Sequence, residues 1–258
     1  MNSNEQKIKQ TASLLRKATH AVALTGAGIS TPSGIPDFRS PSSGLWSHAD
    51  PFQVATIYAF KQRPQDFYDW IRPLTQLMLD ATPNPAHIAL AQLEAHGPLK
   101  SVITQNIDLL HTRAGSQTVY ELHGHIREMT CIRCYHVFDA APYLQDVLTQ
   151  ERVPHCPACG GVLKPNVILF GEQLPVRVFN EARKESRTCD LMLIIGTSLE
   201  VEPAANLPLL ARETGAHLVI INESATYMDS HADVVIRADV ADILPQITAA
   251  FLSHATEP

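Results

Sequence analysis

Short apolar runs alternate with amphipathic segments along most of the chain. The runs that favour β-strands cover residues 21–25, 101–104, 119–122, 191–195, 217–222 and 234–236. Helical spacing of apolar residues, or a proline at the start with a glycine after the end, predicts helices at 4–18, 86–96, 108–113, 176–187 and 204–213. Strands that alternate with helices are typical of a parallel sheet covered on both faces. The pattern therefore predicts an α/β fold with a doubly wound parallel sheet.

Two stretches interrupt this alternation. Residues 46–81 carry aromatic and apolar residues at helical spacing but contain no strand-like run, and residues 127–162 hold four of the five cysteines. We interpret 46–81 as a helical insertion and 127–162 as a metal-binding module, which together form a smaller domain. The larger, Rossmann-like nucleotide-binding domain is then expected to comprise residues 1–45, 82–126 and 163–258.

The glycine-rich segment after the first apolar run is the strongest pointer to a ligand. Gly26 and Gly28 let backbone amides approach a ligand without a Cβ in the way. A helix that began here would direct its unpaired N–H groups at a phosphate. The segment predicts a nucleotide site, although a glycine turn that only packs a strand on a helix gives the same pattern. Thr31 replaces the third glycine of the dinucleotide fingerprint, which disfavours a nicotinamide oxidoreductase.

Composition narrows the protein class. Hydrophobic residues make up 45% of the 258 residues, so a sizeable core is expected. The net charge of −6 argues against nucleic-acid binding. The sequence has no apolar run of about 18 residues, so we expect no membrane span. The polar first ten residues do not resemble a signal peptide, and we expect a cytoplasmic protein.

Four cysteines form two C-x-x-C pairs separated by 21 residues. The pairs are Cys131 with Cys134 and Cys156 with Cys159. Two thiolate pairs can complete the tetrahedral shell of one zinc ion, and four protein ligands leave no open position for catalysis. We therefore predict a structural zinc site, with redox-active or free cysteines as the alternative. Cys189 is expected to be a small core residue.

Polar residues or glycines follow the ends of several predicted strands, where open α/β sheets bind ligands. They are Gln105, Asn106 and Asp108, then His123, then Gly196, Thr197 and Ser198, then Asn222 and Glu223. His123 is a candidate general base because imidazole titrates near physiological pH. Taken singly, these residues have simpler interpretations: Asn106 or Asp108 caps a helix, and His123 lies on the surface.

In combination, these motifs resemble the sirtuin family of NAD-dependent protein lysine deacylases, from about residue 20 to residue 242. The first motifs in chain order are Gly26-Ala27-Gly28-Ile29-Ser30, Ile35-Pro36-Asp37-Phe38-Arg39, Gln105-Asn106-Ile107-Asp108 with Leu110-His111, and His123-Gly124. The cysteine quartet follows, and after it come Lys164-Pro165-Asn166, Phe170-Gly171-Glu172, Gly196-Thr197-Ser198 with Val201 and Pro203, and Ile221-Asn222.

The resemblance implies a role for each motif in binding NAD. The diphosphate would be held by Gly26, Ala27, Gly28, Ser30, Gly196, Thr197 and Ser198. The nicotinamide end would be held by Gln105, Asn106, Ile107 and Asp108, under a mobile loop that carries Asp37, Phe38 and Arg39. The adenosine end would meet Asn222, Glu223 and Val240. His123 would be the general base, with Asn106 beside it in the catalytic site, and the one zinc ion would be structural.

The resemblance also implies the substrate site and the reaction. An acyl-lysine protein or peptide would add as a β-strand between residues 171–174 and 199–203, with Val167 lining the acyl-lysine tunnel. The residues assigned to this site are Val167, Phe170, Gly171, Glu172, Leu199 and Val201, together with Tyr68 and Ile71 of the helical insertion. The acyl oxygen would attack C1′ of the nicotinamide ribose and displace nicotinamide. His123 would then take a proton from the ribose hydroxyls, and water would release lysine and O-acyl-ADP-ribose.

One departure from the family bears on the acyl group. A subgroup that prefers negatively charged acyl groups carries Tyr-x-x-Arg in the helical insertion. Here Tyr68 is followed three positions later by Ile71, and the arginine is Arg72. One position turns a side chain by about 100° around a helix. We therefore expect neutral acyl groups, acetyl first, although Tyr68 and Ile71 are equally consistent with core packing.

Two other functions fit the same cofactor site. One is a mono-ADP-ribosyltransferase, and the other is a sensor that binds NAD or ADP-ribose without turnover. The presence of Asn106, Asp108 and His123 favours deacylation over transfer but leaves both open, and His123 argues against a sensor, which has no need of a base.

Overall fold

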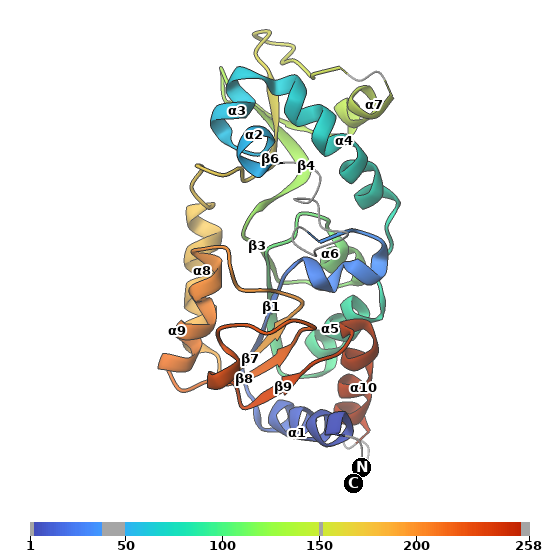
Figure 1. Cartoon of the computed structure of the whole chain (residues 1–258), viewed down its shortest axis with the longest axis vertical. Coiled ribbons are helices and arrows are strands. Elements are labelled where there is room, and N and C mark those ends of the chain that lie inside the picture. The colour runs from blue at the N-terminus through green and yellow to red at the C-terminus, as the bar shows by residue number, and fades with distance from the viewer. Residues whose placement is uncertain (1–2, 38–49, 150–151, 254–258) are drawn as a thin grey trace.

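A six-stranded parallel sheet is the centre of the larger part of the molecule (Figure 1). The computed structural model describes residues 3–37, 50–149 and 152–253. The strands lie in the order β3-β2-β1-β7-β8-β9 and all pairs are parallel. Their bounds are β1 Ala21–Thr25, β2 Leu99–Thr104, β3 Val119–Glu121, β7 Leu191–Ile195, β8 His217–Ile221 and β9 Val234–Ile236. The order reverses between β1 and β7, as in a doubly wound fold, so the predicted fold class is confirmed.

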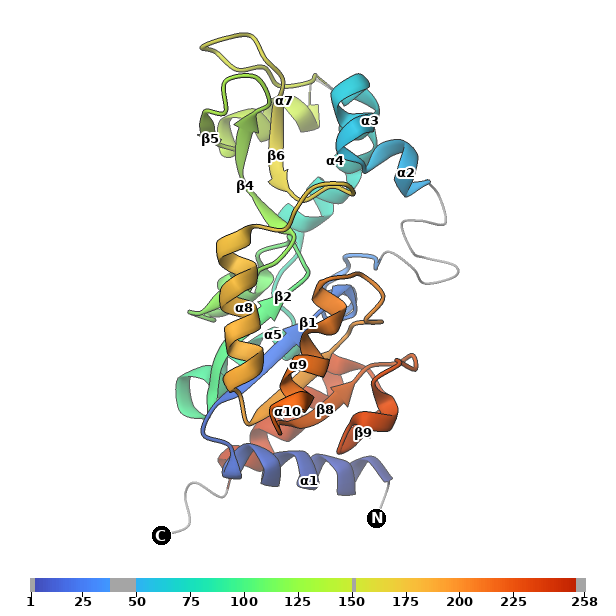
Figure 2. The same cartoon turned by 90° about the vertical axis from the view of Figure 1, so that its left-hand side faces the viewer.

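Helices cover both faces of this sheet (Figures 1 and 2). One face packs against α1 (Ser3–Lys17), α5 (Pro85–His96) and α10 (Val240–Leu252), and the other against α8 (Val176–Thr188) and α9 (Leu207–Glu213). Alternate residues of a strand point to opposite faces. In β1, accordingly, Ala21 and Ala23 pack toward the first helix layer and Val22 and Leu24 toward the second.

A second, antiparallel sheet lies at the opposite end of the elongated molecule from α1 (Figure 2). Its order is β5-β4-β6, with β4 Gly124–Cys131, β5 Val137–Asp139 and β6 Leu163–Val167. The helices α2 Pro51–Val54, α3 Ile57–Gln62, α4 Pro64–Asp80 and α7 Ala141–Thr149 lie at this end, and α6 Leu110–Ala114 lies between the two sheets. A separate apolar core holds this end together, with Phe60, Phe67 and Tyr68 at its centre.

Some predicted elements differ from the observed ones. The glycine-rich segment after β1 forms a pair of 3-10 turns and no α-helix: η1 Ala27–Ile29 and η2 Thr31–Ser33, which ends at Gly34 with a left-handed φ of 85°. The segment 204–213 is divided into η4 Ala204–Asn206 and α9. Pro208 therefore lies in the first turn of α9, where a missing N–H is tolerated, and it does not kink a longer helix. Helix α10, which contains Pro245, was not predicted.

The second sheet includes residues 124–126 and 163–167, which the predicted division gave to the larger domain. That division into domains stays a prediction. Within the described ranges, no helix combines the length and the apolar character needed to cross a membrane.

Candidate active site and metal centre

Two glycine-containing turns, one after β1 and one after β7, pack against each other and are joined by hydrogen bonds. The amide of Gly26 donates to the carbonyl of Ile195 at 3.1 Å, and the amide of Gly28 donates to the carbonyl of Gly196 at 2.9 Å. Gly196 has a left-handed φ of 58°, and a Cβ there would lie 2.4 Å from the amide nitrogen of Ile29. Packing alone thus demands these glycines. The same contact places two main-chain turns at the switch point of the sheet, where α/β folds bind ligands.

A chain of hydrogen bonds joins Asn106, Ser30 and Asp108 beside these turns. The Nδ2 of Asn106 donates to Ser30 Oγ at 3.1 Å and to the carbonyl of Gly26 at 3.2 Å. The Ser30 hydroxyl donates to Asp108 Oδ2 at 2.6 Å, and the amide of Leu110 donates to Oδ1 at 2.9 Å. Burial raises the pKa of the Asp108 carboxyl, although the bonds from Ser30 and Leu110 oppose that shift. Asp108 therefore supports the start of α6 and also faces the glycine turn.

His123 lies between the two sheets and is held in one tautomer. Its Nδ1 lies 2.9 Å from the main-chain oxygen of Gln105. A carbonyl oxygen only accepts, so the proton of the neutral ring is on Nδ1 and the lone pair is on Nε2. The Gln105 side chain in turn donates to Thr197 Oγ1 at 2.9 Å. The residues that follow β2, β3 and β7 are thus brought together, and His123 is oriented as a base.

The remaining predicted cofactor residues are spread along the same edge. Ser198 and Ile107 are half-buried beyond β7 and β2, and Asp37 is half-buried at the end of the first described range. Phe38 and Arg39 lie outside the described residues. The other three follow β8 and β9, where Asn222 and Val240 are buried and Glu223 is exposed.

The segment 167–172 connects the predicted base to the helical insertion. The amide of Ile168 donates to the carbonyl of His123 at 2.8 Å. Phe170 donates its amide to the carbonyl of Ala55 at 2.9 Å and accepts from the amide of Ile57 at 3.0 Å. The Phe170 main chain is therefore paired already, and the exposed Gly171 follows it with a left-handed φ of 86°.

The other predicted substrate residues differ in exposure. Leu199 is buried, has a φ of 56°, and donates its amide to Thr197 Oγ1 at 3.2 Å, whereas Val201 is half-buried. The Glu172 carboxylate bonds within its own loop, where Oε2 accepts from the amide of Leu169 at 2.8 Å.

Tyr68 and Ile71 line a small apolar cavity of about 10 Å³ together with Val167, Ile126 and Val147. The Tyr68 hydroxyl donates to the carbonyl of Leu163 at 2.6 Å, and burial raises the pKa of this phenol. Both residues belong to the core of this end of the molecule, as the packing interpretation expects, and their assignment to the substrate site stays a prediction.

Arg72 is directed elsewhere. Its Nε donates to the carbonyl of Val147 at 2.8 Å, and its Nη2 donates to Asp69 at 2.8 Å.

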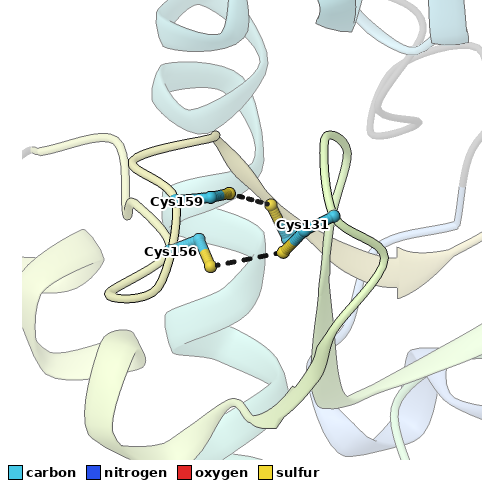
Figure 3. A group of neighbouring side chains, drawn as sticks. Cys131, Cys156 and Cys159 are labelled. Atoms are coloured by element: carbon cyan, nitrogen blue, oxygen red, sulfur yellow. Dashed lines mark hydrogen bonds between the residues drawn. The ribbon is translucent and has the colours of Figure 1, made fainter.

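The four paired cysteines converge on one point. Figure 3 shows three of them, Cys131, Cys156 and Cys159, with their side chains directed toward one another. All four sulfur atoms lie within 4.8 Å of one another. Sγ of Cys131 is 3.5 Å from that of Cys159, and Sγ of Cys134 is 3.7 Å from that of Cys156. These separations are too long for disulfides. A tetrahedral zinc ion with Zn–S bonds of about 2.3 Å separates its sulfur ligands by about 3.8 Å. The quartet fits one structural zinc ion, and Cys189 lies apart from it in the core of the larger sheet.

Sequence reasoning missed a buried polar cluster at the ends of β1 and β2, formed by Thr25, Thr104 and His111. Thr25 Oγ1 donates to Thr104 Oγ1 at 2.9 Å and lies 2.9 Å from His111 Nε2, and the amide of Asn106 donates to Thr104 Oγ1 at 3.1 Å. Burial lowers the pKa of His111, and it lowers the pKa of the neighbouring His87 to about 4. The available signal was that Thr25 and Thr104 both end apolar strands, which the sheet pairs side by side.

Comparison with known proteins gives one consistent family. A model of the Sir2 family matches residues 26–203. An NAD-dependent protein deacylase 2 of Archaeoglobus fulgidus is 44% identical over 244 residues, which cover 94% of this chain and 95% of that protein. A solved structure concerning the mechanism and regulation of Sir2 enzymes has a TM-score of 0.91 at 43% identity, and the match covers 97% of this chain and 99% of the other. A Sir2 structure with a p53 peptide and NAD+ has a TM-score of 0.85 at 40% identity, with coverage of 93% and 96%.

Proposed function

This chain belongs to the Sir2 family, and we propose that it is an NAD-dependent protein lysine deacylase with acetyl-lysine as its preferred substrate. The observation that carries the proposal is the convergence of His123, Asn106 and Asp108 on the two glycine turns at the switch point. NAD would supply the ribose carbon from which nicotinamide departs. The acyl group and NAD must meet in one orientation, and such positioning contributes about 7–11 kcal/mol to catalysis.

We assign the residues as follows. His123, with its proton held on Nδ1 by the Gln105 carbonyl, takes a ribose hydroxyl proton on Nε2. Asn106 and Asp108 hold the nicotinamide end, and their mutual bonds through Ser30 fix them before the ligand arrives. A positioned base contributes about 10²–10⁴-fold. A preformed cluster of this kind favours turnover over mere sensing of the nucleotide.

The acyl-lysine peptide binds as an added strand between 171–174 and 199–203. The pairing of Phe170 with Ala55 and Ile57 supports this assignment, because it leaves the exposed Gly171 as the next residue available for a partner strand. One Sir2 structure contains a peptide and NAD+ together, as the proposed reaction requires.

The test is incubation with NAD and an acetyl-lysine peptide. Deacylation is expected to give free nicotinamide, deacetylated peptide and O-acetyl-ADP-ribose in equal amounts, measured by mass spectrometry. Label transferred from NAD to protein would instead identify a mono-ADP-ribosyltransferase. Binding of NAD without nicotinamide release would identify a sensor.

We expect acetyl-lysine to be preferred over succinyl-lysine by at least about 100-fold in kcat/KM. The Tyr68 hydroxyl is bonded to Leu163, and Arg72 is bonded to Val147 and Asp69. Neither side chain is thus available to a succinyl carboxylate, which would lose its hydration without gaining a cation, and this costs several kcal/mol. A panel of acetyl, propionyl and succinyl peptides of one sequence measures the preference. Equal rates on acetyl and succinyl peptides would contradict it.

The control for this preference is Tyr68→Phe. The variant should keep the ratio of acetyl to succinyl activity, because the Tyr68 hydroxyl bonds a main-chain carbonyl and is not available to the acyl group. It should lose about 1–3 kcal/mol of unfolding free energy, since the buried Leu163 carbonyl loses its donor. A ratio that changes strongly in Tyr68→Phe would show that the phenol contacts the acyl group.

A further inference from the structure

Lys164 is a buried cation with no role in the assignments above. Its side chain lies in the interior beside β6, and its Nζ donates to the carbonyls of Val167 at 2.7 Å and Pro165 at 3.1 Å. The third partner is Glu172 Oε2, also at 3.1 Å. Burial lowers the pKa of Lys164, while the neighbouring Glu172 carboxylate opposes the shift. All three ammonium protons therefore have acceptors in one short stretch of chain.

The Glu172 carboxylate also bonds to the main chain of its own turn. Glu172 Oε2 accepts from the amide of Leu169 as well as from Lys164, so a single oxygen joins the turn 169–172 to β6. Its side chain is 21% exposed and that of Lys164 is 11% exposed, so water screens the pair little. Glu172 is also predicted at the substrate site, and its carboxylate bonds inside the loop.

This loop has two further attachments, and both reach the proposed site. The Ile168 amide donates to the carbonyl of His123. The Phe170 main chain donates to Ala55 and accepts from Ile57, which attaches the loop to the helical insertion. Val167, whose carbonyl accepts from Lys164, directly precedes Ile168. The position of the Lys164 ammonium thus fixes the start of the segment that meets both the base and the peptide.

We propose that Lys164 and Glu172 form a brace that positions segment 167–172 for the acyl-lysine peptide and, through Ile168, aligns the His123 main chain. The substrate part of this inference rests on the proposed function. Lys164 is a positioning residue, because its contacts are to protein carbonyls and a carboxylate. An apolar side chain here leaves the half-buried Glu172 carboxylate without its cation, which is unfavourable, so the carboxylate turns toward water and the loop moves with it.

The test compares Lys164→Met, Lys164→Arg and the surface control Lys184→Met, whose lysine forms an exposed pair with Glu181 at 3.9 Å. Titration calorimetry measures binding of ADP-ribose and then of an acetyl-lysine peptide to the ADP-ribose complex. Lys164→Met should weaken peptide binding about 10- to 100-fold, as expected for a site displaced by about 1 Å. ADP-ribose affinity should remain within about twofold. Lys164→Arg, which keeps the charge and the donors, should recover most of the peptide affinity, and Lys184→Met should match the parent.

Hydrogen exchange of the amides in 167–172 separates the brace from the proposed function. Faster exchange in Lys164→Met, with the rest of the chain unchanged, is the expected result. Unchanged exchange or unchanged peptide affinity would overturn the brace. If the parent protein bound ADP-ribose but no acyl peptide, the proposed function would fail, and the exchange rates would still decide the brace. Should Lys164→Met not fold, Glu172→Gln gives the same readouts, because it removes the carboxylate charge at nearly constant volume.

Discussion

Replacing His123 with alanine is expected to lower the rate of O-acetyl-ADP-ribose formation by about 10²–10⁴-fold, while ADP-ribose still binds. The ring bonds the main-chain carbonyl of Gln105 through Nδ1, so Nε2 carries the lone pair that accepts a proton. The glycine turns and the Asn106–Ser30–Asp108 chain do not depend on the imidazole for their own bonds. Single-turnover kinetics with NAD and an acetyl-lysine peptide, together with calorimetry of ADP-ribose binding, measure the two effects separately.

The control for His123→Ala is His217→Ala. His217 begins β8 at the opposite end of the sheet, where its Nδ1 lies 3.0 Å from Asp233. This variant should keep the parent rate within about twofold, since a polar contact of an exposed side chain contributes at most about 1 kcal/mol to stability. A His123→Ala protein that turns over at the parent rate would refute the assignment of the base. One that no longer folds or binds ADP-ribose would show that His123 is structural.

The sheet was predictable where the chain is apolar without interruption. The runs at 21–25, 191–195 and 234–236 match β1, β7 and β9, because strands buried on both faces carry apolar residues throughout. The second sheet gave no such signal. In β4, polar and apolar residues mix, and its partner β6 lies more than thirty positions further along the chain. Helix α10 was hidden by Pro245, which in an isolated sequence argues for a break.

In the sequence, close packing or helix capping was an alternative to ligand binding for several residues. In the structure the two roles are compatible. Gly28 and Gly196 are required by close packing, and Asp108 supports the start of a helix, as the simpler interpretations had it. The same residues also line the switch point, because the carboxyl ends of neighbouring parallel strands meet at one edge. Pairs such as Thr25 with Thr104 could not be predicted, since they depend on which strands become neighbours and in what register.

Removing the zinc ion is expected to unfold the part of the molecule that surrounds the four cysteines. The apolar cluster here is small, and two of the cysteines, Cys131 and Cys156, are themselves among its buried members. Structural zinc contributes about 10–16 kcal/mol in isolated zinc-binding peptides, so the loss exceeds what this cluster can offset. Cys156→Ser should therefore lose its zinc and show a separate, low-temperature unfolding transition. Atomic absorption and scanning calorimetry measure these changes, and deacylation should fall with them.

The matched control is Cys189→Ala, which removes a buried thiol from the core of the larger sheet. It should retain one zinc ion per chain and lose only about 1 kcal/mol of unfolding free energy.

Zinc loss in Cys156→Ser, unlike the loss of the Cys189 thiol, should also affect the predicted substrate segment through Leu163. Leu163 belongs to the same cluster as the quartet, accepts the Tyr68 hydroxyl and directly precedes Lys164. Metal loss should therefore loosen both the packing around Tyr68 and the Lys164–Glu172 brace. Full zinc content with parent stability in Cys156→Ser would refute a four-cysteine site, and full activity in metal-free protein would refute the coupling to the acyl-lysine segment.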